Sequence, residues 1–149
     1  MADRQAQLAA VLATLQLPAN VQIRAWTDAD MPAIQELSDR HGWPTNHEPE
    51  EVRTSWRNAW PALVATRDDI VVGYVRGLTD EVTTLHITDL LVDPNLRGQG
   101  IGRLLLEVCY LLYPRTIINL IAEPEAIPFY KAIGYRDGSV SFIYHKGFR

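Results

Sequence analysis

The chain has 149 residues, of which 47% are hydrophobic and 21% are charged, a balance typical of one globular domain with a sizeable core. A net charge of −4 and the lack of a basic stripe argue against a nucleic-acid partner. The single cysteine, Cys109, excludes an internal disulfide and a paired-cysteine metal site. With no membrane-length apolar run and no signal-peptide layout, we expect a cytoplasmic protein without a membrane partner.

The first sixty residues predict three helices and one strand. Apolar residues at helical spacing mark an accessory N-terminal helix within residues 1–20 that ends before Pro18: Leu8, Val11, Leu12 and Leu15. Residues 21–26 alternate like a strand, and Thr27 or Asp28 caps a helix that ends near Gly42. After a loop over 41–47, a further helix is expected over 48–58.

The rest of the chain predicts strands first and then alternating strands and helices. Strands are expected over 62–66 and 70–77, around a turn at Asp68 and Asp69, and over 83–92. A helix over 101–112, a strand over 116–121, a helix over 125–133 and a last strand over 139–145 follow. This order predicts one α/β domain over 1–149, a three-layer α/β/α fold with a mixed, mostly antiparallel sheet.

A glycine-rich loop connects the strand that ends near Val92 to the helix that begins near Ile101. Gly98, Gly100 and Gly102 would let a phosphate approach the backbone, and the N–H groups that open a helix attract an anion. The G-x-G-x-G spacing excludes the Rossmann fingerprint, and the missing Lys-Ser/Thr pair excludes the Walker pattern. The loop therefore predicts another kind of phosphorylated ligand, and a turn that only caps the helix is the alternative.

Two segments resemble one enzyme family. The pattern Arg97-x-x-Gly100-x-Gly102 is similar to the acetyl-CoA pyrophosphate loop of the GNAT superfamily of N-acetyltransferases, and AIPFYKAIGY over 126–135 is similar to its A-x-x-F-Y-x-x-x-G-F segment. The resemblance covers roughly residues 63–145 and is closest in pattern to the short arylalkylamine (serotonin) N-acetyltransferase-like branch. It implies a GNAT-like fold and acetyl-CoA as co-substrate, with no metal.

The resemblance also implies roles for particular residues. The strand before the loop would carry a bulge, with the N–H of Leu90 donating to the acetyl carbonyl and with Leu91 and Val92 holding the pantetheine arm. Tyr130 would be the general acid toward the CoA thiolate, and a packed aromatic is the alternative. Glu123 stands where many relatives carry an asparagine that contacts the cofactor. The remaining expected cofactor contacts are Arg97, Gly98, Gln99, Gly100, Ile101, Gly102, Arg103 and Phe129.

Transfer to an amine also needs a group that removes a proton, because most alkylamines are protonated at neutral pH. His86 and Asp89 are the candidates on the strand before the loop. Simple alternation would put them on opposite faces of the sheet, unless a bulge intervenes. For each of them, a surface polar side chain is the alternative.

Aromatic and imidazole side chains gather around the first pair of long helices, the region that walls the acceptor pocket in the family. His41, Trp43 and His47 are expected to contact the substrate, whereas Trp56 and Trp60 are expected at the edge of the core. An aromatic wall would suit a hydrophobic or cationic amine. The spacing of the histidines does not support a metal site.

These expectations combine into one function and two alternatives. We expect acetyl transfer from acetyl-CoA to the primary amine of a small molecule, directly in a ternary complex, because no nucleophile accompanies the motifs. A non-catalytic acyl-CoA-binding module is one alternative, and an acetyltransferase for a protein lysine or N-terminus is the other. The sequence leaves a homodimer open.

Overall fold

The computed structural model describes residues 3–43, 45–138 and 141–142. Its five strands form one sheet in the order β1-β2-β3-β4-β5, in which neighbours are antiparallel except for the parallel pair β4 and β5. The strands are β1 (Val21–Ala25), β2 (Ala62–Arg67), β3 (Ile70–Thr79), β4 (Thr84–Val92) and β5 (Ile117–Leu120). The mixed, mostly antiparallel sheet is thus confirmed. The strand expected over 139–145 falls almost entirely outside the described residues.

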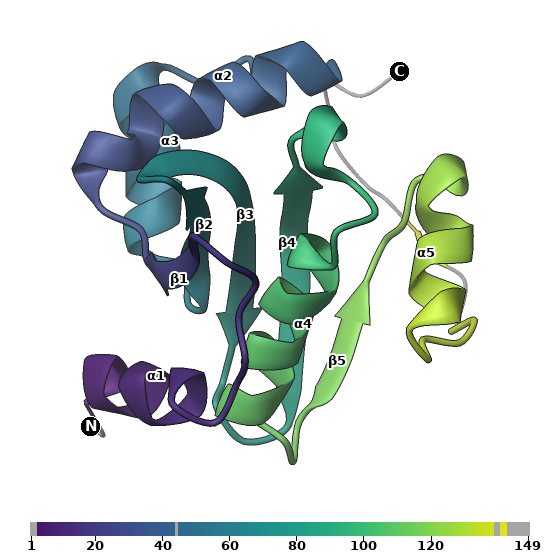
Figure 1. Ribbon diagram of the computed structural model, residues 1–149. Helices are drawn as coiled ribbons and strands as arrows, with labels where there is room; N and C mark the ends of the chain where they lie inside the picture. The colour runs from purple at the N-terminus through teal and green to yellow at the C-terminus, as the bar shows by residue number, and fades with distance from the viewer. Residues whose placement is uncertain (1–2, 44, 139–140, 143–149) are drawn as a thin grey trace.

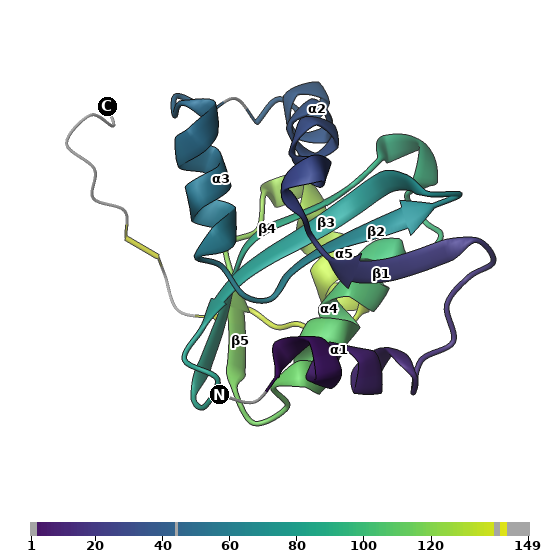
Figure 2. The same cartoon turned by 90° about the vertical axis from the view of Figure 1, so that its left-hand side faces the viewer.

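Helices cover both faces of the sheet, as Figure 2 shows. They are α1 (Arg4–Leu12), α2 (Met31–His41), α3 (Pro49–Arg57), α4 (Ile101–Leu112) and α5 (Ile127–Ala132). One core, which includes the fully buried Leu63, Leu85 and Leu105, lies between the sheet and α1 and α4. A second core lies under α2 and α3, where Ile34 and Trp56 pack near Tyr74 of β3. The expected three layers are therefore confirmed.

Local sequence chemistry sets most element boundaries. The β2–β3 turn holds Asp68 and Asp69 at φ 51° and 64°, as a tight hairpin turn requires. Thr27 begins a short 3-10 turn over Asp28–Asp30 that leads into α2. The N-terminal helix ends earlier than its apolar spacing predicts, at Leu12. Leu15 still packs against the core from the segment that follows the helix.

A bulge interrupts the pairing of β3 with β4. Arg76 pairs with Asp89 and Gly77 pairs with Ile87, so Thr88 is an extra residue in β4. Before the bulge Ile87 faces the α4 core, and after it Leu90 does. The extra residue reverses the alternation and places His86 and Asp89 on the same face of the sheet, the face on which α2 and α3 pack. Simple alternation, which puts them on opposite faces, is therefore wrong here.

Candidate active site

The site begins where β4 and β5 part (Figure 1). The pairing of these strands covers only Thr84–Ile87 against Ile117–Leu120. Among the described residues, the later part of β4, residues 88–92, has no strand partner on this side. An open strand edge offers backbone donors and acceptors to an extended ligand.

The ladder with β3 determines which backbone groups of β4 reach this edge. The N–H of Asp93 donates to the carbonyl of Val72 at 2.7 Å. Because hydrogen-bonded and non-hydrogen-bonded pairs alternate along antiparallel strands, Leu91 pairs its backbone with β3, whereas Leu90 and Val92 direct theirs toward the open edge. The expected position of the Leu90 N–H therefore agrees with the ladder. The expectation for Leu91 does not agree, because its backbone N–H and carbonyl hydrogen-bond β3 and are not free to bind a ligand at the open edge.

A cavity of about 680 Å³ occupies the gap between the parted strands. Its walls come from β4, from the glycine loop, from the segment after β5 and from α5. The expected cofactor-contacting residues that line it are Leu90, Leu91, Val92, Arg97, Gly98, Gly100, Ile101, Gly102, Arg103, Phe129 and Tyr130. Gln99 is the exception: it is absent from the described lining, and its side-chain oxygen accepts a hydrogen bond from Arg67 at 2.9 Å.

The glycine loop fits a phosphate group. Gly98 and Gly100 have φ values of 80° and 84°, and a Cβ on either would meet no described atom within 4 Å, so the space beside the loop is open. Gly100 is the N-cap of α4, and in the described chain no side chain caps that end. The first-turn N–H groups can therefore bind an anion. Gly102 has another role, because its Cβ would lie 3.4 Å from Phe129 Cζ.

A chain of polar contacts joins four of the residues that line this cavity. Trp43 Nε1 donates to Glu123 Oε1 at 2.6 Å, and His41 Nε2 lies 3.4 Å from Glu123 Oε2. Arg97 Nη2 lies 3.2 Å from His41 Nδ1. The hydrogen bond from Trp43 lowers the pKa of Glu123. The carboxylate thus connects the end of α2 to the segment before α5, a contact that the sequence did not suggest.

Tyr130 lies on α5 and lines the same cavity. Its ring contacts Phe129 and Tyr135 at centroid distances of 5.0 and 5.7 Å. Burial, with a smaller contribution from the charge of Glu123, raises the pKa of Tyr130 above that of a free phenol. The hydroxyl therefore keeps its proton at neutral pH and can donate it.

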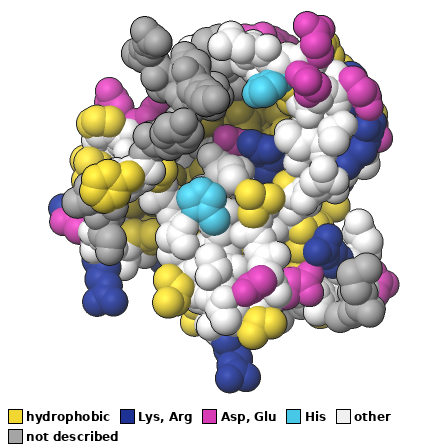
Figure 3. Space-filling view, turned by 180° about the vertical axis from the view of Figure 1, so that it is seen from behind, with side chains coloured by type: hydrophobic (Ala, Val, Ile, Leu, Met, Phe, Trp, Pro, Cys, Tyr) yellow, Lys and Arg dark blue, Asp and Glu magenta, His cyan; other side chains and the backbone are white. Residues whose placement is uncertain are grey.

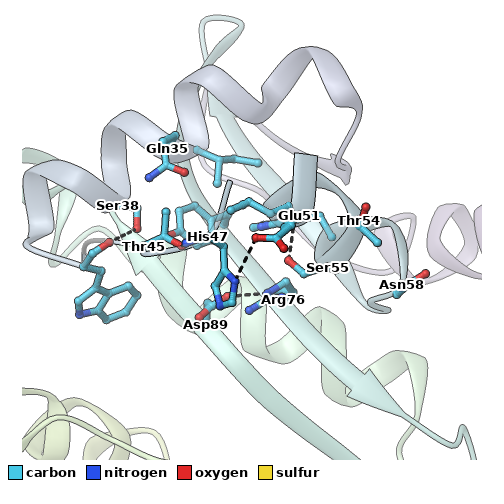
Figure 4. Close-up of a pocket in the computed structure, with 15 residues that line it drawn as sticks. Gln35, Ser38, Thr45, His47, Glu51, Thr54, Ser55, Asn58, Arg76 and Asp89 are labelled. Atoms are coloured by element: carbon cyan, nitrogen blue, oxygen red, sulfur yellow. Dashed lines mark hydrogen bonds and ion pairs between the residues drawn. The ribbon is translucent and has the colours of Figure 1, made fainter. Parts of the chain in front are cut away.

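A second cavity, of about 610 Å³, lies on the α2/α3 side of the sheet (Figures 3 and 4). Figure 3 shows a hollow on this face, with acidic and basic side chains exposed inside it. Trp43 and Asp89 line both cavities, so the two spaces are neighbours, with Asp89 beside the β4 bulge. Such an arrangement can bring two ligands together at one point.

The expected substrate contacts divide between the two cavities. His47 lines the second cavity and His41 lines only the first. His86 is absent from the described lining of both, and its Nδ1 hydrogen-bonds the side-chain oxygen of Asn119. Trp60 is in the core as expected, with its Nε1 donating to the Tyr113 hydroxyl at 2.8 Å. Trp56 is also buried, but it contributes to the wall of the second cavity.

Sequence reasoning missed Arg76, which lines the second cavity from β3. Its Nε donates to Asp89 Oδ2 at 2.6 Å, and its guanidinium lies 5.9 Å from the centroid of the Trp56 ring. An arginine within an otherwise apolar strand is the signal that could have found it. In the part of the chain that the structure describes, no group of three or more metal-ligating side chains is present. The helices described there are all too short or too polar to cross a membrane.

Comparisons with known proteins agree with this geometry. The model of the acetyltransferase (GNAT) domain family matches residues 58–137. A putative acetyltransferase from Deinococcus radiodurans R1 superimposes with a TM-score of 0.69 at 25% identity, over 88% of this chain and 92% of that one.

Curated relatives show the same similarity at the level of sequence. Histone acetyltransferase TAP1 of Glycine max is 29% identical over 72% of this chain and 52% of its own length. Peptidyl-lysine N-acetyltransferase YjaB of Salmonella typhimurium is 36% identical over 58% of each chain. Serotonin N-acetyltransferase 2 of Oryza sativa is 28% identical over 75% of this chain and 59% of its own length. The match thus spans about half of the length of these relatives.

Proposed function

The chain belongs to the acetyltransferase (GNAT) domain family, and from this premise we propose that it transfers an acetyl group from acetyl-CoA to the primary amine of a small molecule. The observation that carries the proposal is that two neighbouring cavities share Trp43 and Asp89 in their walls. One cavity has the glycine loop, which would bind the phosphates, and an open strand edge, and the other is a separate space that would hold the acceptor. Two ligands that meet at one point can react directly in a ternary complex.

The residues of the first cavity fit the parts of acetyl-CoA, which when bound supplies an activated acetyl thioester. The first-turn N–H groups of α4, with Arg97 and Arg103, would hold the pyrophosphate. The open edge of Leu90 and Val92 would hold the pantetheine arm as a neighbouring strand does. The N–H of Leu90 would donate to the carbonyl oxygen, where negative charge develops in the transition state.

Asp89 and Tyr130 would handle the protons. Asp89 lies at the junction of the cavities, so its carboxylate would accept a proton from the incoming amine, directly or through water. Tyr130 keeps its proton because burial raises its pKa, so it would protonate the departing thiolate. Cys109 is fully buried and its pKa is raised to about 12 by desolvation, which favours direct transfer over an acyl-cysteine.

The experiment mixes the protein with acetyl-CoA and a panel of amines and follows the release of free thiol. We expect turnover on small primary amines. Asp89→Asn should lower kcat by about 100-fold or more, the usual contribution of a general base, with little change in CoA affinity. Loss of turnover in His86→Gln together with full activity in Asp89→Asn would assign the base to His86 instead. CoA binding without turnover on any acceptor would refute catalysis and support an acyl-CoA-binding module.

A second candidate function is transfer to a protein lysine or N-terminus. The names of two relatives favour it, because one is a histone acetyltransferase and another a peptidyl-lysine N-acetyltransferase. Lysine-containing peptides in the same thiol assay discriminate the two candidates. Peptides with a higher kcat/KM than every small amine would establish the second function.

A further inference from the structure

The floor of the second cavity holds an ion pair, and we propose that this pair selects an α-amino acid as the acceptor. In this arrangement the amino group lies at Asp89 and the carboxylate binds the guanidinium of Arg76. The inference rests on the proposed acetyl transfer and names its substrate class. It requires that the pair has binding capacity left, and that its charges are placed so as to match those of the ligand.

The first requirement concerns the hydrogen-bonding capacity of the pair. The contact between Arg76 Nε and Asp89 Oδ2 uses one of the five N–H donors of an arginine side chain. Within the described residues the Arg76 side chain makes no other hydrogen bond. The side chains are 21% and 28% exposed, so both reach the cavity while remaining partly desolvated. The terminal guanidinium nitrogens can therefore bind a carboxylate, which arginine binds in a bidentate manner.

The second requirement concerns direction. Asp89 lines both cavities, whereas Arg76 lines only the second. A ligand whose ammonium group pairs with Asp89 presents its amine to the first cavity, where the thioester would lie. Its negative group would then lie deeper in the second cavity, beside Arg76. An α-amino acid carries both charged groups on one carbon, the Cα, and the ion pair presents the complementary charges side by side (Figure 4).

The other charged groups of the cavity compete weakly with this pair. His47 and Glu51 lie 3.4 Å apart, but their side chains are 74% and 64% exposed, so solvent and salt screen them. A plain amine or a polyamine has no carboxylate, so the guanidinium of Arg76 would have Asp89 as its single anionic partner among the groups of this pair and the ligand. Such an acceptor would also bring a second cation close to Arg76, which costs free energy in a partly desolvated site.

The part of the wall beside the ion pair that is aromatic and aliphatic suits an apolar side chain. The rings of Trp56 and Tyr74 meet edge to face at a centroid distance of 5.4 Å, and Ile34 and Val52 lie beside them in the lining. The volume of about 610 Å³ is within the range of small-molecule sites, about 300–1,000 Å³. We therefore expect amino acids with large apolar or aromatic side chains to be preferred.

The test compares acceptors that differ only in the carboxylate. Phenylalanine, phenylalaninamide and phenethylamine are supplied with acetyl-CoA, and thiol release gives kcat/KM for each; leucine and leucinamide form a second set. Phenylalanine is expected to exceed its amide by about 10- to 100-fold, the value of a charge-assisted hydrogen bond. The amide has the more easily deprotonated amine, so chemical reactivity alone would favour the opposite order.

Variants connect this preference to Arg76. Arg76→Lys keeps the charge but loses the bidentate fork, and Arg76→Gln loses both, so each should reduce the acid-to-amide ratio toward one, mainly through KM for the amino acid. The ratio is informative even where overall activity falls, and CoA affinity confirms that each variant is folded. The matched control is Arg57→Gln, which removes exposed contacts to Glu50 and Asp28 and should keep the wild-type ratio.

The outcomes separate this inference from the proposed function. Equal or faster turnover of the amide or of phenethylamine by the wild-type protein overturns the amino-acid assignment and leaves acetyl transfer standing. A clear preference for lysine-containing peptides overturns it as well. An unchanged ratio in both Arg76 variants overturns the role of Arg76. CoA binding without thiol release from any acceptor refutes the acetyl transfer itself, and the inference with it.

Discussion

Gly100 offers a sharp test of the proposed phosphate binding by the glycine loop, because it has a matched partner elsewhere in the fold. Gly100 and Gly42 have nearly the same backbone conformation, with φ values of 84° and 83°, and a Cβ on either meets no described atom within 4 Å. An alanine in this left-handed region costs about 1–2 kcal/mol. The lower entropy of the unfolded chain offsets about 0.4–1 kcal/mol of that cost. Each Gly→Ala variant should therefore lose about 1 kcal/mol of folding free energy.

The two variants should differ only in their affinity for CoA. The Cβ of Gly100→Ala would project into the open space beside the loop, where a phosphate would approach the first-turn N–H groups of α4. Loss of a charge-assisted hydrogen bond there should weaken CoA binding by about 10- to 100-fold. Gly42 is not among the described residues that line the first cavity, so the CoA affinity of Gly42→Ala should stay within about twofold of wild type.

Two measurements decide the matter. Thermal unfolding without ligand should show similar decreases in Tm for both variants, about 2–4 °C for a loss of about 1 kcal/mol in a domain of this size. Isothermal titration calorimetry should show weaker CoA binding for Gly100→Ala alone. An unchanged affinity in Gly100→Ala would refute the phosphate role of the loop. Equal weakening in both variants would attribute the effect to general loosening of the fold.

Three further predictions address catalysis and stability. Tyr130→Phe should lower kcat by about 100-fold or more while the Kd of CoA, measured by calorimetry, stays within about twofold; an unchanged kcat removes Tyr130 from proton transfer. Asp30→Asn should destabilise the fold at pH 7 by about 2–3 kcal/mol, because the buried carboxylate accepts two hydrogen bonds from Arg24. The Arg24 contact lowers the pKa of Asp30, so this contribution is complete above the ordinary carboxyl pKa and is lost as the pH falls through the folded-state value. In urea unfolding, the difference in unfolding free energy between Asp30→Asn and wild type should thus be smaller in acid than at pH 7. A difference that is larger in acid would contradict the pairing. Leu105→Ala, in the centre of the α4 core with 0% exposure, should cost about 2–5 kcal/mol in urea unfolding, and a loss below about 1 kcal/mol would contradict its place in that core.

The sequence predicted the elements well because their signals are local. The apolar stripe of α4 predicted its bounds without error, and the Asp68-Asp69 pair predicted the hairpin turn. The N-terminal helix was predicted too long, because Leu15 continues the apolar spacing although it packs from a loop. Apolar spacing reports which residues are buried, and a residue outside a helix can be buried too.

The residues of the candidate site also fall into two groups, those that local motifs predict and those that only tertiary contacts bring together. Gly98, Gly100 and Tyr130 carry motifs that need only their neighbours in the chain, and all three line the first cavity. The contact of Trp43 with Glu123 and the pair of Arg76 with Asp89 join residues from separate elements, and no local pattern predicts such contacts.

By itself the sequence determined the order of the described elements, the place of the glycine loop and the family resemblance, since each depends on residues adjacent in the chain. Only the tertiary structure decided the relation of His86 to Asp89. The extra residue Thr88 appears only when β4 is paired with β3, and it turns Asp89 toward the second cavity. Register is a property of two strands together, so the face on which a candidate base lies cannot be read from one strand alone.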